Sequence, residues 1–596
     1  MLEKLIALTL TRKGMIVFIS LLIVVFGIYS AFNISIDAFP DVTNIQVEII
    51  SHADGLSAME IERNVTYPIE MAMRGIPDLV QMRSVTKFGL SIVTLVFKDN
   101  VDVYFARQLV FERLGEAKES VPKGVEITMG PIATVMGEIY QYTLEGKIPK
   151  DSLEKINYLT DLRTIQEWVI TPQLKNVPGV NEINSFGGYF KQYQVIVSPG
   201  KLLKYNISAD EVYAAISNNN QNVGGNILER NSEQYIIRSV GLIRSINDIE
   251  NIVLKSYDGI PVYIRDVAQV KIGEAVRMGA ALKSGPEETV GGIVMMLKGE
   301  NSREVVRQVK EKVKEINESN MLPNSLKIVP YYDRTHIVND SIFTIIRALF
   351  EGSILVLIVT FILLRSFRGS AVILIALPVS LLLTFIFMKL LGISANLMSI
   401  GGLVISTGMK FDASIIQVEN VQRLLNEGKS KASRFSLILK AILDVRKPSI
   451  YGELIIAITF IPILALEGIE GKMFAPLAIT VGLAIIASLL MSIFIIPQLC
   501  SIFLKPQAEK ESPVMKFFSK KYLPLLRYSI KRKYVVLFTA LVALITSLFL
   551  FTRLGTEFIP IMDEGAFDMD IALLPGVSLA KSIEIQKMAI SKLEKF

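Results

Sequence analysis

The sequence predicts a polytopic α-helical membrane protein that carries a large α+β domain outside the membrane. The 596 residues are 51% hydrophobic, with a mean hydropathy of +0.44, which is too apolar for a soluble protein of this length. Charged residues still make up 20% of the chain and lie in blocks between long apolar stretches. One such block, residues 35–340, is long enough to fold as a domain of its own.

Seven apolar stretches are each long enough to cross about 30 Å of hydrocarbon as a helix. They lie at residues 14–34, 342–364, 370–391, 396–418, 448–466, 473–503 and 534–553. The first follows Arg12-Lys13 and has no small-residue cleavage site, so we expect a retained helix rather than a signal peptide.

Lys and Arg fall in alternate connections between these stretches, as the positive-inside rule requires. They follow the second stretch at Arg365 and Arg368, the fourth at 423–447 and the sixth at 505–533. This alternation places the N-terminus in the cytoplasm and residues 35–340 on the opposite face. We therefore expect a multi-pass protein of a bacterial inner membrane with a large periplasmic domain.

Composition excludes several classes of function. One Cys and two His rule out a disulfide framework, a cysteine-rich zinc module and a histidine ligand cluster. The net charge of +6 comes from Lys and Arg beside apolar segments, which argues against nucleic-acid binding. The sequence offers no nucleophile–base pair and no phosphate loop, so we expect neither an enzyme nor a cofactor.

Six regions follow from these patterns. They are the N-terminal end with the first transmembrane helix (1–34), a periplasmic region (35–340), transmembrane helices two to six (341–504), a cytoplasmic linker helix (505–533), transmembrane helix seven (534–553) and the start of a second periplasmic domain (554–596). Within the first periplasmic region, residues 45–49 and 193–197 alternate as strands, and 57–74 and 103–119 have helical patterns.

The start of the chain is repeated near its end. Arg12-Lys13 and Arg532-Lys533 each precede an apolar span, and Pro40 and Pro560 follow those spans at the same separation of 520 residues. Each span leads to an expected strand, a glycine turn and a helical pattern. We therefore expect one complete half of a duplicated transporter, followed by a truncated start of the second half.

Two carboxylates in the fourth span are candidates for a proton relay. Asp412 and Glu419 are seven residues apart, two helical turns, so they share one face of the helix. Charges at such depth are costly, and a carboxylate there can gain and lose a proton near neutral pH. Glu419 could instead snorkel or cap a neighbouring helix. Glu453 in the fifth span is either a further relay partner or a structural hydrogen-bonding group, and Lys410 has no assigned role.

Four residues outside the spans are candidate metal ligands. Glu138 lies in the segment from Pro131 to Tyr140, and Asp568, Met569 and Asp570 lie in an expected strand after Gly565. Strand alternation would put the two aspartates on one face and Met569 on the other. Carboxylates suit divalent cations, whereas methionine suits Cu(I) or Ag(I). The alternative is an exposed acidic strand with no ligand.

Short motifs along the whole chain give it a resemblance to a known family. The motifs are Ala38-Phe39-Pro40-Asp41-Val42, Pro131 to Tyr142, Asn222-Val223-Gly224-Gly225, Glu233-Gln234-Tyr235, Tyr332-Asp333-Arg334-Thr335, Leu364 to Gly369, Gly392 to Ser399, Asp412 to Asn420, Glu467 to Phe474 and Leu554 to Pro560. With these motifs the chain resembles the heavy-metal efflux branch of the resistance-nodulation-division (RND) family, which includes cobalt-zinc-cadmium and copper-silver pumps.

The resemblance implies an RND fold, here the first half plus the start of the second repeat. It also implies a proton-driven metal antiporter of the inner membrane. Such a pump works as a homotrimer with a periplasmic adaptor and an outer-membrane channel, and binds metal in its porter domain. By the same resemblance, Asp412 is the relay acid and Glu419 its companion.

Some positions depart from the family pattern. Ser406 stands where divalent-metal members carry an Asp, and Lys410 replaces an apolar residue. Glu138 matches an acidic site of divalent-metal pumps, and Asp570 stands where copper-silver pumps carry a methionine. The balance favours Zn, Co, Ni or Cd as substrate. A Cu(I)/Ag(I) pump, a non-transporting remnant or split half, and a multidrug pump are the alternatives.

Overall fold

The chain folds into two compact units. The computed structural model describes residues 2–37, 39–53, 55–132, 135–285, 287–323, 325–364, 366–427, 433–506, 513–555, 567, 569–574 and 576–595. Unit 1 comprises Met1–Ile139, Met295–Arg307 and Asp333–Met569, and unit 2 comprises Tyr140–Val294, Gln308–Tyr332 and Asp570–Phe596.

Each of the seven predicted spans coincides with a helix of unit 1. These helices are α2 (Lys13–Asn33), α13 (Arg334–Leu364), α14 (Phe367–Leu390), α15 (Leu397–Glu427), α16 (Arg434–Thr459) continued by α17 (Ile461–Leu464), α18 (Gly468–Phe503) and α20 (Lys533–Phe551). Among the described residues, five of them are long and apolar enough to cross a membrane: α2, α14, α16 with α17, α18 and α20. Helices α13 and α15 include residues whose side chains lie outside the described set.

Helices α15 and α16 extend well past their apolar segments. The sequence predicted a basic loop over 423–447, but α15 continues to Glu427 and α16 already begins at Arg434. Ser433 caps α16 by accepting a hydrogen bond from the backbone N–H of Ser436. The prediction was wrong because hydropathy marks only the lipid-spanning part of a helix, whereas capping decides where the helix begins.

Small residues allow close contact between the helices of the bundle. A Cβ atom at Gly27 of α2 would lie 2.5 Å from the Cβ of Leu382 in α14, and one at Gly402 of α15 would lie 2.8 Å from the carbonyl oxygen of Leu477 in α18. Only glycine permits these approaches, as is usual where transmembrane helices pack. The bundle core also takes in the short N-terminal helix α1 (Leu2–Thr11), whose Ile6 is fully buried.

The long-period repeat recurs in the backbone conformation. Arg12 separates α1 from α2 with φ −99° and ψ 59°, and Arg532 separates α19 (Pro513–Lys531) from α20 with φ −110° and ψ 44°. The later turns match as well, because Gly55 and Gly576 have φ of +83° and +87°. A shared break and a shared left-handed turn support the expected duplication.

Unit 1 also contains a four-stranded antiparallel sheet. Its strands are β1 (Ile45–His52), β2 (Leu79–Lys87), β3 (Leu90–Phe97) and β4 (Glu126–Met129), in the order β2-β3-β1-β4. Its helices are α3 (Ala58–Ile61), which runs through a π-helical turn (Glu62–Thr66) into α4 (Tyr67–Met73), and α5 (Val103–Ser120). Val47, Val93 and Leu95 of the sheet share one core with Ile69 and Val110 of the helices. The predicted strand 45–49 and helices 57–74 and 103–119 are confirmed.

A second sheet repeats this topology. Its strands are β5 (Glu138–Glu145), β6 (Val180–Gly187), β13 (Ala281–Lys283), β14 (Glu287–Met296) and β15 (Lys327–Asp333). The order is β13-β14-β5-β15, with β6 also paired to β14. Its helices are α6 (Ser152–Ile165), which leads through a π-helical turn (Gln166–Ile170) to α7 (Thr171–Lys175), and α12 (Ser302–Glu318). If the short β13 is left out, β5, β6, β14 and β15 follow one another and pair in the same way as β1, β2, β3 and β4 of the first sheet. Each of the two sheets, with its helices, is therefore a split βαβ unit.

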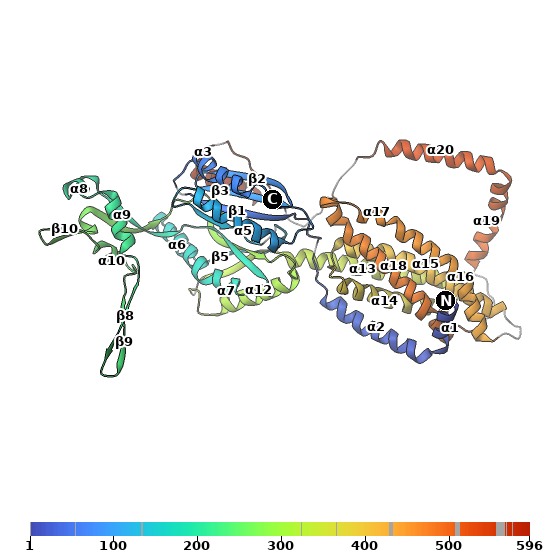
Figure 1. Cartoon of the computed structure of the whole chain (residues 1–596). Coiled ribbons are helices and arrows are strands. Elements are labelled where there is room, and N and C mark those ends of the chain that lie inside the picture. Colours follow the sequence, from blue (N-terminus) through green and yellow to red (C-terminus); the bar gives the residue numbers. More distant parts are fainter. Residues whose placement is uncertain are drawn as a thin grey trace. The chain divides into compact units, whose positions relative to one another are not determined.

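A separate module is inserted between β6 and β14. It contains β7 (Lys191–Val197), α8 (Pro199–Lys204), α9 (Ala209–Asn218), β8 (Val223–Arg230), β9 (Glu233–Ser239), α10 (Ile246–Glu250), β10 (Val253–Tyr257), β11 (Ile260–Tyr263), α11 (Ile264–Val267) and β12 (Ala268–Glu274). The predicted strand 193–197 is confirmed as part of β7, which pairs with β12. The β8–β9 hairpin projects from the module and is exposed along its length (Figure 1).

The strand expected after Gly565 was a wrong prediction for the described residues. Residues 569–574 have no regular secondary structure and lead to α21 (Leu579–Leu593). Alternation in sequence does not make a strand by itself, because a strand needs a hydrogen-bonded neighbour. None of the described strands pairs with this segment.

Candidate functional site

The predicted relay helix leaves one face uncovered. Ile405, Gly408, Ile416 and Glu419 of α15 are all exposed, and their spacing places them on the same face as position 412. Asp412 itself lies within α15, but its side chain lies outside the described residues. The spacing argument from the sequence therefore holds for the helix. What the sequence did not reveal is that this face is open.

The opposite face of α15 packs inside the bundle. Val418 and Val421 join the core formed with α14, α16 and α18. Ser406, which stands where the resemblance implies an acid, is 1% exposed and donates its hydroxyl to the carbonyl of Leu403 at 2.8 Å. It therefore has a local structural partner. The side chain of Lys410 lies outside the described residues.

Glu453 forms a buried ion pair within its own helix. Its Oε1 and Oε2 accept hydrogen bonds from Nη1 and Nη2 of Arg446 at 2.8 and 3.2 Å. The Arg446 side chain is 0% exposed and that of Glu453 11%. Ser449 lies 3.3 Å from the guanidinium and 3.4 Å from the carboxylate. Two-point contact with a buried cation is the geometry of a structural partner, one of the two roles expected for Glu453.

Two buried glutamines were missed by the sequence reasoning. Gln417 of α15 is 0% exposed and Gln498 of α18 is 2% exposed. Neither side-chain amide has a hydrogen-bond partner among the described residues. Buried amides are rarely left unpaired, so these two mark a polar part of the bundle interior. The sequence signal that could have found them is a Gln within an apolar run of a span, at 417 and at 498.

A polar junction joins the end of the first span to the start of α15. The backbone N–H of Asp37 donates to the carbonyl of Ala395 at 3.2 Å, and the N–H of Ala395 donates to Ser35 at 2.8 Å. The Asp37 carboxylate accepts from the hydroxyl of Ser302 at 2.9 Å. Burial raises the pKa of Asp37, while the Ser302 hydrogen bond and the charge of Arg334 oppose that shift. The junction thus ties α15 to the first turn of α12.

The predicted metal ligands do not form a cluster in the part of the chain that the structure describes. No group of three or more His, Cys, Asp or Glu side chains there could hold a metal ion. Glu138 lies at the start of β5 and is partly exposed, whereas Met569 and Asp570 are exposed in the irregular segment. Asp568 lies outside the described residues. These four positions stay a prediction.

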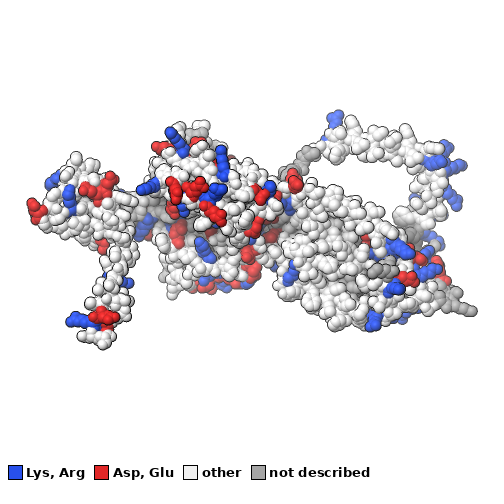
Figure 2. Space-filling view, in the orientation of Figure 1, with Lys and Arg blue, Asp and Glu red and all other residues white. Residues whose placement is uncertain are grey.

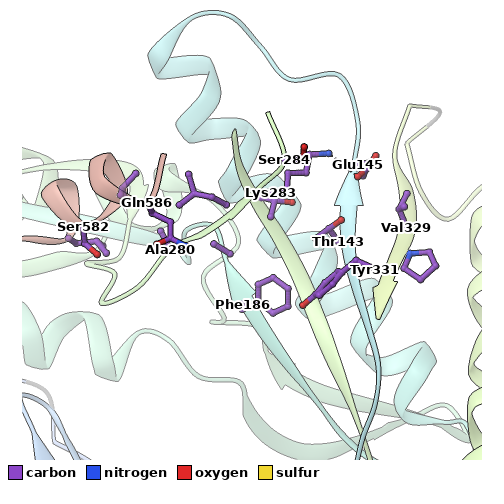
Figure 3. Close-up of a pocket in the computed structure, with 16 residues that line it drawn as sticks. Thr143, Glu145, Phe186, Ala280, Lys283, Ser284, Val329, Tyr331, Ser582 and Gln586 are labelled. Carbon is purple, nitrogen blue, oxygen red and sulfur yellow. Dashed lines mark ion pairs between the residues drawn. The ribbon is translucent and has the colours of Figure 1, made fainter. Parts of the chain in front are cut away.

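Unit 2 contains a cavity of about 800 Å³ between its sheet and α21 (Figure 3). Glu145 of β5 and Lys283 of β13 form an ion pair of 2.9 Å at its wall, and Phe186 and Tyr331 add aromatic surface. The carboxylate of Glu594 holds the end of α21 by accepting from the Ser284 hydroxyl at 2.7 Å and the Gly285 N–H at 2.5 Å. These hydrogen bonds lower the pKa of Glu594. Among its described residues, the lining has one carboxylate, already paired, and therefore no ligand set for a divalent cation.

Comparison with known proteins identifies the family. A model of the AcrB/AcrD/AcrF family matches residues 5–596. The chain belongs to the AcrB/AcrD/AcrF family. The predicted resemblance to the heavy-metal efflux branch of the RND transporters is thereby confirmed, together with the RND fold.

Individual members of this family are similar along nearly the whole chain. The cation efflux system protein CzcA of Alcaligenes sp. (strain CT14) is 42% identical over 98% of the chain, and the cation efflux system protein CusA of Escherichia coli K12 is 35% identical over 98%. A crystal structure of a heavy metal efflux pump superposes with a TM-score of 0.86 and 32% identity over 99% of the chain. The chain spans 56% of the length of each of these three relatives.

Proposed function

We propose that the chain supplies the first membrane half of a proton-driven metal-efflux pump and that the open face of α15 is its coupling surface. The carrying observation is that Ile405, Gly408, Ile416 and Glu419 are exposed, whereas Val418 and Val421 on the opposite face of α15 are buried in the bundle core. The face with position 412 is then free to pack against a second membrane half, where Asp412 and Glu419 exchange protons. Glu453 contributes by holding Arg446, which makes it a structural group rather than a relay member.

The proposed location is a bacterial inner membrane, with residues 35–340 in the periplasm. Five described helices have the length and apolar composition of spans. Figure 2 displays Lys and Arg gathered at the end of the helix bundle that carries the N-terminus. By the positive-inside rule, that end is the cytoplasmic one.

The proposed substrates are the divalent cations of Zn, Co, Ni and Cd. Glu138, Asp568 and Asp570 would supply carboxylate oxygens, which suit such ions better than thioether sulfur does. The 42% identity to a cation efflux protein named CzcA supports this choice. Cu(I) and Ag(I) are the alternative, for which Met569 is the available ligand.

The proposed assembly is a homotrimer joined to a periplasmic adaptor and an outer-membrane channel. The β8–β9 hairpin supports such assembly, because Ile227, Leu228, Tyr235 and Ile236 are 49%, 52%, 50% and 79% exposed. A two-stranded hairpin is marginal in water on its own, and contact with another subunit would cover these side chains.

Metal tolerance of a pump-deficient bacterium tests the proposal. The chain is expressed alone and together with a complete second half, as wild type and as Asp412→Asn. Glu427→Gln, at the exposed end of the same helix, is the matched control. We expect protection against zinc or cobalt only with the second half, lost in Asp412→Asn and retained in the control. Protection that survives Asp412→Asn, or that is absent in every combination, would contradict the proposal. Protection against silver alone would select the Cu(I)/Ag(I) alternative.

A further inference from the structure

Helix α19 (Pro513–Lys531), which connects α18 to α20, carries only positive charge. Residues 513–533 contain seven Lys or Arg residues and no Asp or Glu. The helix ends at Lys531, and the transmembrane helix α20 begins two residues later at Lys533. A strongly basic helix beside a span is a feature that a membrane surface can recognise.

Four of the basic residues form one stripe along α19. Lys516, Lys520, Arg527 and Lys531 are separated by 4, 7 and 4 residues, which confines them to a sector of about 60° at 100° per residue. All four are exposed, and Lys and Arg are visible along this helix in Figure 2. We call these four residues the basic stripe.

A broad apolar side adjoins the basic stripe. Phe518, Tyr522, Leu525, Leu526 and Ile530 lie within a sector of about 140° and are 61%, 60%, 63%, 37% and 69% exposed. A wide apolar face of Phe, Tyr and Leu flanked by Lys and Arg is the pattern of a helix that lies in the plane of a membrane interface.

The internal repeat provides a comparison within the same chain. Helix α1 precedes span α2 as α19 precedes span α20. At the repeat distance of 520 residues, Ile6 and Leu10 of α1 correspond to Leu526 and Ile530 of α19. Ile6 and Leu10 are 0% and 2% exposed in the bundle core. The same positions of α19 are therefore apolar but uncovered.

The two residues of the basic stripe that have counterparts in α1 are not basic there. Arg527 and Lys531 correspond to Ala7 and Thr11, which are uncharged and not buried in the bundle. Even if a second membrane half covered Leu526 and Ile530 as the first half covers α1, Arg527 and Lys531 would stay on the outside. Their charge is therefore not explained by helix packing.

We propose that the basic stripe of α19 binds the phosphates of anionic phospholipids in the cytoplasmic leaflet. The apolar side enters the acyl boundary, while Lys and Arg reach back to the phosphates and retain their hydration. Anionic lipids are favoured over zwitterionic ones because no headgroup amine neutralises the phosphate. The proposal requires membrane insertion of the chain but not metal transport, so either can fail without the other.

Lipid retention by the purified full chain tests this proposal. Native mass spectrometry counts the phosphatidylglycerol and phosphatidylethanolamine molecules bound to wild type and to a variant with all four stripe residues changed to Gln. The matched control changes Lys201, Lys204, Lys271 and Lys327, all exposed residues outside the spans, to Gln. We expect phosphatidylglycerol affinity to fall at least about tenfold in the stripe variant alone, since each basic side chain adds to the attraction. Equal affinity in all three proteins would overturn the proposal.

The depth of α19 gives a second readout. Leu525→Cys is labelled with an environment-sensitive dye, because the one native thiol, Cys500, is fully buried and so protected from the dye. In bilayers containing phosphatidylglycerol, we expect brominated lipid to quench the dye and aqueous iodide to leave it bright. Quenching by iodide, or protection from both quenchers as protein packing would give, overturns the proposal.

Discussion

The buried pair of Arg446 and Glu453 makes a quantitative prediction about the membrane bundle. Glu453→Gln removes the charge that balances a guanidinium with 0% exposure. Breaking a buried pair from one side costs about 3–5 kcal/mol, because the remaining charge has no compensation. A loss of about 3 kcal/mol raises the population of open molecules roughly a hundredfold, since 1.4 kcal/mol is about a factor of ten. Replacing both residues by Met should recover most of the loss.

Cys500 provides the assay for this prediction. It is the only cysteine of the chain, is 0% exposed and lies in the bundle core. Its rate of reaction with a thiol-reactive coumarin in detergent therefore reports opening of the bundle. Asp444→Asn, an exposed carboxylate on the same helix, is the control and should react like wild type. If Cys500 of Glu453→Gln also reacts at the wild-type rate, the pair has no structural role, and this result would favour the interpretation of Glu453 as a relay residue.

Three further predictions concern other contacts. Gly187→Ala should destabilise unit 2 by about 2 kcal/mol or more, measured by thermal unfolding, because φ is +74° and a Cβ would lie 2.1 Å from the carbonyl oxygen of Thr289; unchanged unfolding would show that this strand end is not held as described. Asn420→Ala should cost about 1–2 kcal/mol in the Cys500 assay through loss of the 2.7 Å hydrogen bond to Ala441, and Gln at that position should restore part of it. Burial raises the pKa of Asp37, so ionisation of this carboxyl opposes folding and the stability of the wild type falls as pH rises through that pKa. Asp37→Asn should therefore become more stable relative to the wild type between about pH 4 and pH 7. A stability difference between the two proteins that does not change with pH would refute this.

The membrane part was predictable from the sequence because it follows from one-dimensional patterns. Apolar length located all seven helices, and the seven-residue spacing put Asp412 and Glu419 on one face of α15. The exposure of that face was not predictable, because it depends on which helices pack around α15. The pairing of Glu453 with Arg446 was within reach, since they too are seven residues apart on one helix.

The sheets were harder to predict because their strand order rests on distant contacts. β5 and β14 are neighbours although about 150 residues separate them in sequence, and no local pattern specifies such pairing. The signal that was missed is a second, shorter repeat. Pro68 and Pro172 each follow a π-helical turn, and Ile76-Pro77 and Val177-Pro178 come shortly after. The strand expected after Gly565 is absent from residues 569–574, because an alternating pattern does not supply the hydrogen-bonded neighbour that a strand needs.

The insertion between β6 and β14 has a consequence for how this protein can vary. The inserted module leaves the sheet at β6 and returns to it at β13, and both of these strands pair with β14. Gly187 and Gly188, with φ of +74° and +67°, turn the chain out at the end of β6. The entropy cost of closing the chain segment between these two strands grows only with the logarithm of the segment's length. The module also has its own apolar core. Natural selection, or an engineer, can therefore exchange the module as a cassette while the sheet that carries it keeps its register.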